Sequence, residues 1–163
     1  MREIQLTQGK VALVDDEDYE LASRFRWYVE RKANGWYARR NIRRPDGRKA
    51  KILLHRAILG AEPGVGVDHI NRDGLDNRRS NLRWASTSQN GANRGLNANS
   101  TSGYKGVDFQ KARGCWRALI ECRGRRLHLG VYATPEEAAR AYDRAAVEFF
   151  GAFARPNFQE VAA

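Results

Sequence analysis

The sequence predicts an α+β protein built from small antiparallel sheets and a few helices. Three observations predict this class. Short apolar runs alternate with tight-turn residues such as Asn34-Gly35 and Arg123-Gly124, which is typical of β-hairpins. A capped helical segment begins at Thr134, after the last of these runs. The 163 residues fit one ordinary domain or two small ones.

Residues 1–56 predict an antiparallel β meander. Gly9 lies between two extended runs, and Asn34-Gly35 lies between two runs that contain Trp and Tyr. Pro45-Asp46-Gly47 offers a third turn before an apolar run. Gly, Asn and Pro-Asp-Gly are residues that tight turns prefer. We therefore expect short neighbouring strands joined by hairpins.

A basic block overlaps this meander. From Arg24 to Arg56 the chain holds 12 basic residues and two acidic ones, interleaved with Trp and Tyr. Arginine and aromatic side chains together suit contacts with sugar–phosphate and bases. We therefore expect DNA contact in this region, with Arg39, Arg40 and Arg43 as candidates. The alternative is an ordinary sheet with a solvated face, and the acidic cluster of residues 15–20 is itself expected to be solvated surface.

Residues 57–94 predict a strand, a loop, a second strand and a helix. The strand candidates are Val65–Ile70 and Asn81–Ala85. Ser86 and Gln89 have the spacing of a capping box, in which each side chain bonds the backbone of the other. A helix of about two turns should therefore run from there to about Arg94.

Residues 95–103 predict a linker, because Leu96 is their only large apolar residue. Residues 104–158 predict a second unit made of three strands and a helix. The strand candidates are Tyr104–Gln110, Cys115–Cys122 and Arg126–Tyr132.

The helix of this second unit has a complete start signal. Thr134 is the expected N-cap, Pro135 takes the first helical position, and Glu137 completes a capping box. One helical stripe is apolar and rich in alanine, which lets a helix lie close to a sheet. It is formed by Ala138, Ala141, Tyr142, Ala145 and Phe149, and Gly151 is the expected stop.

The charge balance points to a polyanionic partner. Lys and Arg number 29 against 19 Asp and Glu, a formal net charge of +10, which favours nucleic acid first and an anionic membrane second. No apolar run approaches the roughly 20 residues of a membrane span, and residues 1–10 lack the apolar core of a signal peptide. We therefore expect a cytoplasmic protein with no membrane partner. Cys115 and Cys122 are expected to be free thiols rather than zinc ligands.

The pair Asp68-His69 is the strongest candidate for chemistry. A strand ends there, and the predicted helix that carries Asn90 returns over it. One carboxylate and one amide suit a hard cation that keeps several waters, Mg²⁺ or Mn²⁺. An imidazole with an ordinary pKa of about 6.5 can take a proton from water at neutral pH. Arg94 and Arg56 are candidate phosphate clamps.

The segment around this pair resembles the HNH endonucleases of the ββα-metal type, specifically the phage and intron-encoded homing subgroup. Asp68-His69, Asn81 and Asn90 stand where that subgroup has its Asp-His pair, its middle Asn and its last Asn. The resemblance implies that Asp68 and Asn90 hold the metal ion, that His69 is the base and that Asn81 braces the loop. His55-Arg56 matches an upstream His-Arg of the subgroup, for which we expect phosphate contact. The site lacks the all-His metal ligands of colicin-like relatives, which argues against Zn²⁺.

Residues 103–158 resemble the ethylene-response-factor (Apetala-two) DNA-binding domain. The resemblance is carried by Tyr104-Lys105-Gly106-Val107, Trp116-Arg117-Ala118, Leu129-Gly130, the run Glu136–Ala146 and Asn157-Phe158. It implies a three-stranded sheet that lies in the major groove and is supported by the helix. Strand alternation then directs Trp116, Ala118 and Ile120 to the helix.

The remaining positions of that sheet are the expected DNA contacts. They are Lys105, Gln110, Lys111, Arg113, Arg117, Leu119, Glu121, Arg126 and His128. Where the plant proteins carry several strand arginines, this chain has Asp108, Gln110, Leu119 and Glu121, so the plant target sequence does not transfer. His128, flanked by Leu127 and Leu129, is expected to be a DNA-facing or solvated side chain rather than a ligand.

The sequence as a whole predicts a site-directed endonuclease of double-stranded DNA, in which water activated by His69 hydrolyses a phosphodiester with Mg²⁺ or Mn²⁺. One active site suggests a nick, and the chain is expected to be a monomer or homodimer. By family analogy the origin is a phage or mobile element in a bacterial cell. The alternatives are a DNA-binding regulator that has lost cleavage, and a nucleic-acid chaperone or RNA binder.

Overall fold

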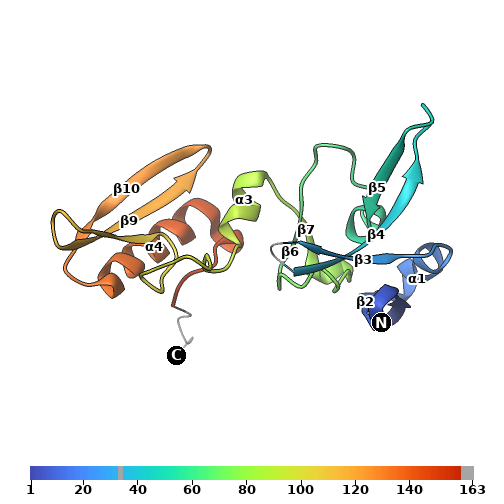
Figure 1. The fold of residues 1–163 in the computed structure, drawn as a ribbon, viewed down its shortest axis with the longest axis horizontal. Helices are drawn as coiled ribbons and strands as arrows, with labels where there is room; N and C mark the ends of the chain where they lie inside the picture. The colour runs from blue at the N-terminus through green and yellow to red at the C-terminus, as the bar shows by residue number, and fades with distance from the viewer. Residues whose placement is uncertain (33–34, 159–163) are drawn as a thin grey trace. The chain divides into compact units, whose positions relative to one another are not determined.

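The computed structural model describes residues 1–32 and 35–158 and confirms the α+β class (Figure 1). The chain divides into two compact units, Met1–Ser86 and Thr87–Ala163, and each is described by itself. No helix within the described residues is both long and apolar enough to cross a membrane. The limits predicted for the motif (57–94), the linker (95–103) and the flanking regions remain predictions about domain organisation.

The first unit contains three small antiparallel sheets. Strand β1 (Arg2–Gln5) pairs with β2 (Val11–Val14) across the short 3-10 helix η1 (Thr7–Gly9), as the turn at Gly9 predicts. The meander is confirmed in strands β3 (Tyr28–Lys32), β4 (Gly35–Arg43) and β5 (Lys49–Leu53), which are neighbours in that order. Asn34, half of the first predicted hairpin turn, lies outside the described residues.

The strand pair around the candidate site is also confirmed, with shorter bounds than predicted. Strand β6 (Val67–His69) pairs with β7 (Leu82–Trp84), so that His69 lies opposite Leu82. A 3-10 turn, η2 (Arg79–Asn81), leads into β7.

Two helices of the first unit were not predicted. Helix α1 (Asp16–Ser23) places three acidic residues in its first turn, where the helix dipole favours negative charge. Helix α2 (Leu54–Ile58) directly continues β5 and buries Leu54 and Ile58, which lie four residues apart on one face. It was missed because one and a half turns are too short to show a helical period.

The core of the first unit lies among these sheets and helices. Trp27 is 2% exposed, and its indole Nε1 donates a 2.9 Å hydrogen bond to the carbonyl of Ala22 in α1. Val29 and Ala38 bring one face of the meander into this core. The opposite face of the meander therefore does not pack into this core.

The second unit is a three-stranded sheet packed on one helix. Helix α3 (Thr87–Ala92) precedes strands β8 (Val107–Gln110), β9 (Cys115–Cys122) and β10 (Arg125–Tyr132), in the order β10-β9-β8. Helix α4 (Pro135–Phe150) covers one face of this sheet, and the 3-10 helix η3 (Gly151–Phe153) follows it. Both cysteines are free thiols.

The predicted ends of α4 are confirmed. The Thr134 hydroxyl accepts from the Glu137 amide at 3.3 Å, and the Glu137 carboxylate accepts from the Thr134 amide at 3.3 Å. Gly151 ends the helix with a φ of +51°, a conformation that favours glycine. Such a reciprocal cap satisfies two donors that would otherwise have no partner in the helix.

One member of the predicted stripe was wrong. Phe149 is 41% exposed, whereas Phe150 is buried beside Tyr142 and Ala146. The buried face is wider than one stripe, since Ala139 and Ala146 also lie against the sheet side of the helix. Gly106 explains the closeness of the packing, because a Cβ there would collide with the Tyr142 ring.

Candidate nuclease site and DNA-facing sheet

A hydrogen-bonded loop joins β6 to β7. The Asn81 side chain accepts from the Asn71 amide at 2.9 Å and donates to the Asn71 side-chain oxygen at 2.9 Å and to the Asp76 carbonyl at 2.8 Å. These three bonds tie both ends and the middle of the loop to one buried amide. This is the geometry of a brace, the role that the resemblance implies for Asn81.

Carboxylate–arginine pairs hold the rest of the loop. Asp76, which is 3% exposed, accepts from Nε and Nη2 of Arg78 at 2.8 and 2.7 Å, and these bonds lower the pKa of Asp76. Arg79 donates from Nε and Nη2 to the two Asp18 oxygens, both at 2.8 Å, and its backbone amide donates to Asp15 at 2.7 Å. The acidic cluster on α1 therefore anchors this loop, in addition to forming surface.

Asp68 and His69 lie side by side on β6 and point to opposite faces of the strand pair. Asp68 lies opposite Arg83 on β7, and Nε and Nη2 of Arg83 both donate to Asp68 Oδ2, at 2.9 and 2.8 Å. Asp68 is 8% and His69 5% exposed. These two donors hold Oδ2 of Asp68 in place.

Three aromatic rings meet on the His69 side. The ring centroids of His55 and His69 are 4.6 Å apart at an interplanar angle of 82°. The Tyr37 ring on β4 lies edge-on to both, 6.1 Å from His55 and 5.8 Å from His69. Gly74 in the loop has no room for a Cβ, because one would collide with Trp36 and Tyr37. Strand β4 of the meander thus packs directly on the β6–β7 loop.

His55 is the buried, uncharged histidine of this cluster. Burial first, and then the charges of His69, Arg56 and Lys32, lowers the pKa of His55 to about 3. Its Nδ1 is buried without a hydrogen-bond partner in the described structure. A ring in this state carries no charge for a phosphate at neutral pH, so the predicted phosphate contact of His55 gains no support.

The pKa of His69 is lowered from its usual value, which favours the neutral imidazole. Burial lowers its pKa, and this outweighs the opposing effects of a hydrogen bond to Asn77 and of the charges of Asp68, Asp73 and Asp76. A neutral imidazole is the form that can accept a proton from water.

Asn77 selects the tautomer of that imidazole. The Asn77 side-chain NH₂ donates to the Leu75 carbonyl at 2.9 Å, which turns the amide oxygen toward His69 Nε2, 3.5 Å away. An amide oxygen only accepts, so a hydrogen bond at this contact requires the tautomer with its hydrogen on Nε2.

The candidate phosphate clamps have different surroundings. Arg56 donates to the carbonyls of Val65 at 2.5 Å, Ala61 at 3.3 Å and Glu62 at 2.6 Å. These contacts make it a brace of the turn after α2, and its phosphate role remains a prediction. Asn90 on α3 and Arg94, two residues beyond that helix, belong to the second unit. Their grouping with Asp68 likewise remains a prediction.

The donor chemistry of Asp68 fits the expected metal ion. Its carboxylate is a hard oxygen donor, and one of its oxygens is bonded to Arg83. Within residues 1–32 and 35–158 no three His, Cys, Asp or Glu side chains gather as a ligand cluster. A carboxylate, an amide and several waters do not need such a cluster.

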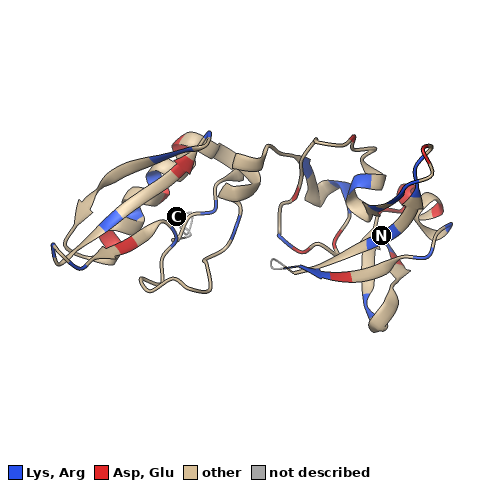
Figure 2. Ribbon diagram, turned by 45° about the horizontal axis from the view of Figure 1, so that its top comes forward, with Lys and Arg blue, Asp and Glu red and all other residues tan. Residues whose placement is uncertain are grey.

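The open face of the C-terminal sheet has the residues that alternation predicts. Ala118 and Ile120 are buried against α4, while Leu119 lies opposite His128 and Glu121 opposite Arg126 on the other face. Arg117 donates to both oxygens of Asp108, at 3.0 and 2.6 Å. Acidic and basic residues therefore alternate on this sheet (Figure 2). The exposed Lys111 and Arg113 lie in the β8–β9 turn, while Lys105 donates to the carbonyls of Ala92 and Arg155.

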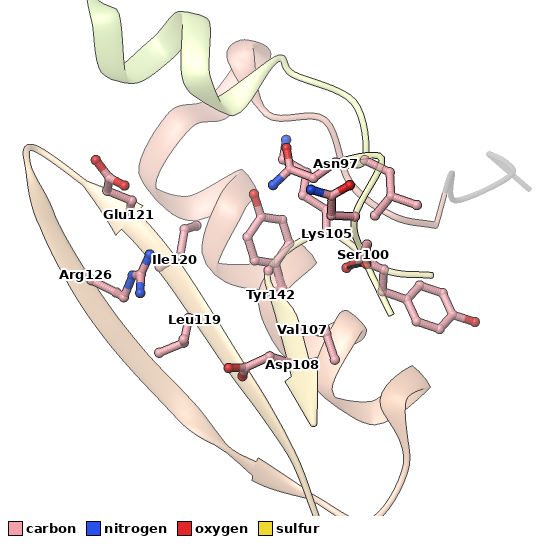
Figure 3. A pocket seen from close by; sticks show the side chains of 14 residues that line it. Asn97, Ser100, Lys105, Val107, Asp108, Leu119, Ile120, Glu121, Arg126 and Tyr142 are labelled. Atoms are coloured by element: carbon pink, nitrogen blue, oxygen red, sulfur yellow. Dashed lines mark hydrogen bonds between the residues drawn. The ribbon is translucent and has the colours of Figure 1, made fainter. Parts of the chain in front are cut away.

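A polar cavity of about 420 Å³ opens at the edge of this face. Figure 3 shows Asp108, Glu121 and Arg126 on the sheet side and Tyr142 of α4 behind them. Asn97 and Ser100, from the segment predicted as a linker, line the other side (Figure 3). The cavity is thus continuous with the open face of the sheet.

Two family comparisons match different parts of the chain. The family model described as HNH endonuclease matches residues 48–92, and the model described as AP2 domain matches residues 102–152. An uncharacterized HNH endonuclease of Acanthamoeba polyphaga mimivirus is 30% identical over 156 residues, which cover 92% of this chain and 76% of that protein. The chain therefore belongs to the HNH endonuclease family and carries a C-terminal AP2 DNA-binding domain.

Plant proteins share only the C-terminal part. An AP2-like ethylene-responsive transcription factor of Arabidopsis thaliana is 47% identical over 58 residues, 36% of this chain and 12% of that protein. A dehydration-responsive element-binding protein of Oryza sativa subsp. indica is 46% identical over 71 residues, 42% of this chain and 26% of that protein.

HNH endonucleases generally use a divalent metal ion, and both domains imply DNA as the ligand.

Sequence reasoning missed three residues of the site: Tyr37, Asn77 and Arg83. A signal existed for Arg83, since pairing the two predicted strands places it opposite Asp68. Asn77 gave no comparable signal, because its contact with His69 depends on how the loop folds back.

Proposed function

We propose that this chain is a divalent-metal-dependent endonuclease of double-stranded DNA, in which His69 activates the attacking water. The observation that supports this most is the buried imidazole of His69, which follows Asp68 on strand β6 in a chain of the HNH endonuclease family. Cleavage directed to particular sites, by a phage or mobile-element product, belongs to the same proposal. The viral origin of the mimivirus relative is consistent with it.

The reaction begins with proton transfer from water to the His69 imidazole. The carboxylates of Asp68, Asp73 and Asp76 favour the imidazolium that forms, while burial favours its return to the neutral state. Such a base can both take a proton and release it to solvent. General base catalysis of this kind contributes roughly 10²- to 10⁴-fold.

Asp68 and Asn90 would hold the metal ion, Mg²⁺ or Mn²⁺. When bound, the ion would polarise the scissile phosphate and stabilise the departing 3′ oxygen. Arg83 orients the Asp68 carboxylate, and Asn81 keeps the loop that carries the site in one shape. A single site of this kind cuts one strand, so the expected first product is a nick.

The C-terminal sheet supplies the second DNA contact. Lys111 and Arg113, in the exposed turn, suit phosphates, whereas Leu119 and Glu121 on β9 and His128 on β10 lie on the open face of the sheet. Contacts to phosphates position a protein, and contacts to base edges specify the sequence. We assign base reading to the strand residues and positioning to the turn.

A plasmid nicking assay tests the proposal. Supercoiled DNA incubated with the protein and Mg²⁺ or Mn²⁺ should become nicked circles, and a chelator should stop the reaction. His69→Ala should abolish nicking while duplex binding stays within about twofold. Absence of nicking with every divalent ion tried would leave a DNA-binding regulator instead.

A further inference from the structure

The two faces of the β3–β4–β5 meander differ in charge. Pairing of the strands places Lys32, Arg39, Arg43, Lys49 and Lys51 on one face, together with Tyr28, Glu30, Tyr37, Asn41 and Leu53. We call this the cationic face. Among its described residues Glu30 is the one carboxylate against five cations, and basic residues mark β4 and β5 in Figure 2.

The opposite face is the core face. It carries Val29 and Ala38, both buried, and Arg40, whose guanidinium lies 3.7 Å from the Phe25 ring centroid. Arg39 and Arg40 therefore cannot both belong to one DNA-facing surface. The prediction of DNA contact gains support for Arg39 and Arg43 but not for Arg40.

Glu30 is the hub of the cationic face. Lys51 Nζ donates to it at 3.2 Å, Arg39 Nε lies 3.2 Å away, and Lys32 Nζ lies 3.8 Å from its other oxygen. Burial raises the pKa of Glu30, but these three cations outweigh it and the pKa is lowered. The carboxylate holds the cations in place before any ligand arrives.

The cationic face leads to His69. Tyr37 lies on it, with its ring 5.8 Å from that of His69, and Lys32 Nζ is 5.3 Å from the Tyr37 ring centroid. From Tyr37 along β4 to Arg43 there are six residue steps, about 20 Å of strand. That length matches roughly six base pairs of duplex at ~3.4 Å each. Lys32, Arg43, Lys49 and Lys51 are exposed along it.

We propose that the cationic face binds the phosphate backbone of double-stranded DNA beside His69, with Arg43, Lys49 and Lys51 as phosphate contacts and Glu30 limiting the affinity. This inference rests on the proposed function for its location at a cleavage site. It extends the DNA surface beyond the two matched domains, since the β3 and β4 residues of the face precede the HNH match at residue 48, while Lys49 and Lys51 of β5 lie at the start of that match. The scissile strand would run along β4 toward Tyr37.

Salt dependence of binding tests the surface without needing cleavage. The full chain carrying His69→Ala is titrated with a short duplex of random sequence over a range of salt concentrations. Each phosphate contact contributes about 0.9 to the slope of log affinity against log salt. The triple change Arg43→Gln, Lys49→Gln and Lys51→Gln should reduce that slope by about 2 to 3. Thermal melts check that the variants fold.

Two single variants separate this surface from general charge effects. Arg31→Gln removes an exposed cation from the opposite face and should leave the slope unchanged, whereas Lys51→Gln should lower it by about 0.9. Glu30→Gln should tighten binding by about two- to fivefold at low salt, the effect of removing one partly exposed negative charge. If the face had only a structural role, neutralising Glu30 would not increase the affinity of the protein for DNA.

The outcomes distinguish this inference from the proposed function. An unchanged slope in the triple variant, or equal effects of Arg31→Gln and Lys51→Gln, overturns the surface even if the wild-type chain nicks plasmid. A reduced slope supports the surface even if no nicking is seen. A slope that changes only with duplex RNA as the probe also overturns it.

Discussion

Asn77 Oδ1 lies 3.5 Å from His69 Nε2, and Asn77 is completely buried. The pair joins the strand that carries the candidate base to the far side of the loop. Since the Asn77 NH₂ is held by the Leu75 carbonyl, the imidazole meets an acceptor at Nε2. Asn77 thus positions the base without touching the reacting atoms.

Replacing Asn77 with Asp should shift the pH dependence of cleavage. A carboxylate facing Nε2 stabilises the imidazolium and raises the pKa of His69, so the base becomes neutral only at higher pH. The acid limb of the kcat/KM profile for plasmid nicking should therefore move to higher pH. Asn77→Ser, which keeps no acceptor at that distance, should lower kcat at all pH values. An acid limb that stays in place with Asn77→Asp, in a folded protein, would contradict this role.

His55 should make the protein less stable in mild acid. Its pKa is about 3 in the folded state and about 6.5 unfolded, so the unfolded chain binds the proton first as pH falls. The stability from the neutral ring is complete above about pH 6.5 and is lost as pH falls toward about 3. Between pH 6.5 and 5 the loss should be about 2 kcal/mol. Urea unfolding of wild type and His55→Gln at both pH values measures it; parallel losses in the two proteins would rule His55 out.

Arg79 should stabilise the loop through α1. Arg79 donates two hydrogen bonds to Asp18, whose side chain is 4% exposed. Without that guanidinium the buried carboxylate would lose its charged partner. Arg79→Met should lower the free energy of unfolding by about 1–3 kcal/mol. The double change Asp18→Asn and Arg79→Met should recover part of this loss, because no charge is left unpaired. The urea midpoints of the single and double variants measure this energy. Strictly additive losses would argue against an energetic coupling between Asp18 and Arg79.

Glu121 should contribute to sequence reading. It faces outward near the end of β9, the central strand, and a carboxylate accepts from the cytosine amino group in the major groove. Glu121→Ala should relax selection at one base pair, by about 1–3 kcal/mol of discrimination. Selection of bound sites from a random duplex pool measures this. Arg144→Ala, an exposed position on α4, is the control, and the same relaxation there would remove Glu121 from the reading surface.

Much of the fold follows from local signals. The turns at Gly9 and Pro45-Asp46-Gly47 and the capping box at Thr134 were predicted correctly, because each depends on residues only a few positions apart. The two short helices α1 and α2 were not, since eight and five residues show too little periodicity. The exchange of Phe149 for Phe150 in the core reflects the same uncertainty of phase along a helix.

By itself, the sequence determined the strands of both units, the cap of α4 and the Asp68-His69 pair, all of which rest on residue type and short spacing. Only the tertiary structure decided that Arg83 holds Asp68, that Asn77 and Tyr37 surround His69, and that Arg40 turns away from the cationic face. These relationships depend on strand register and on how a twelve-residue loop folds back, and both are set by packing between segments that are distant in the chain.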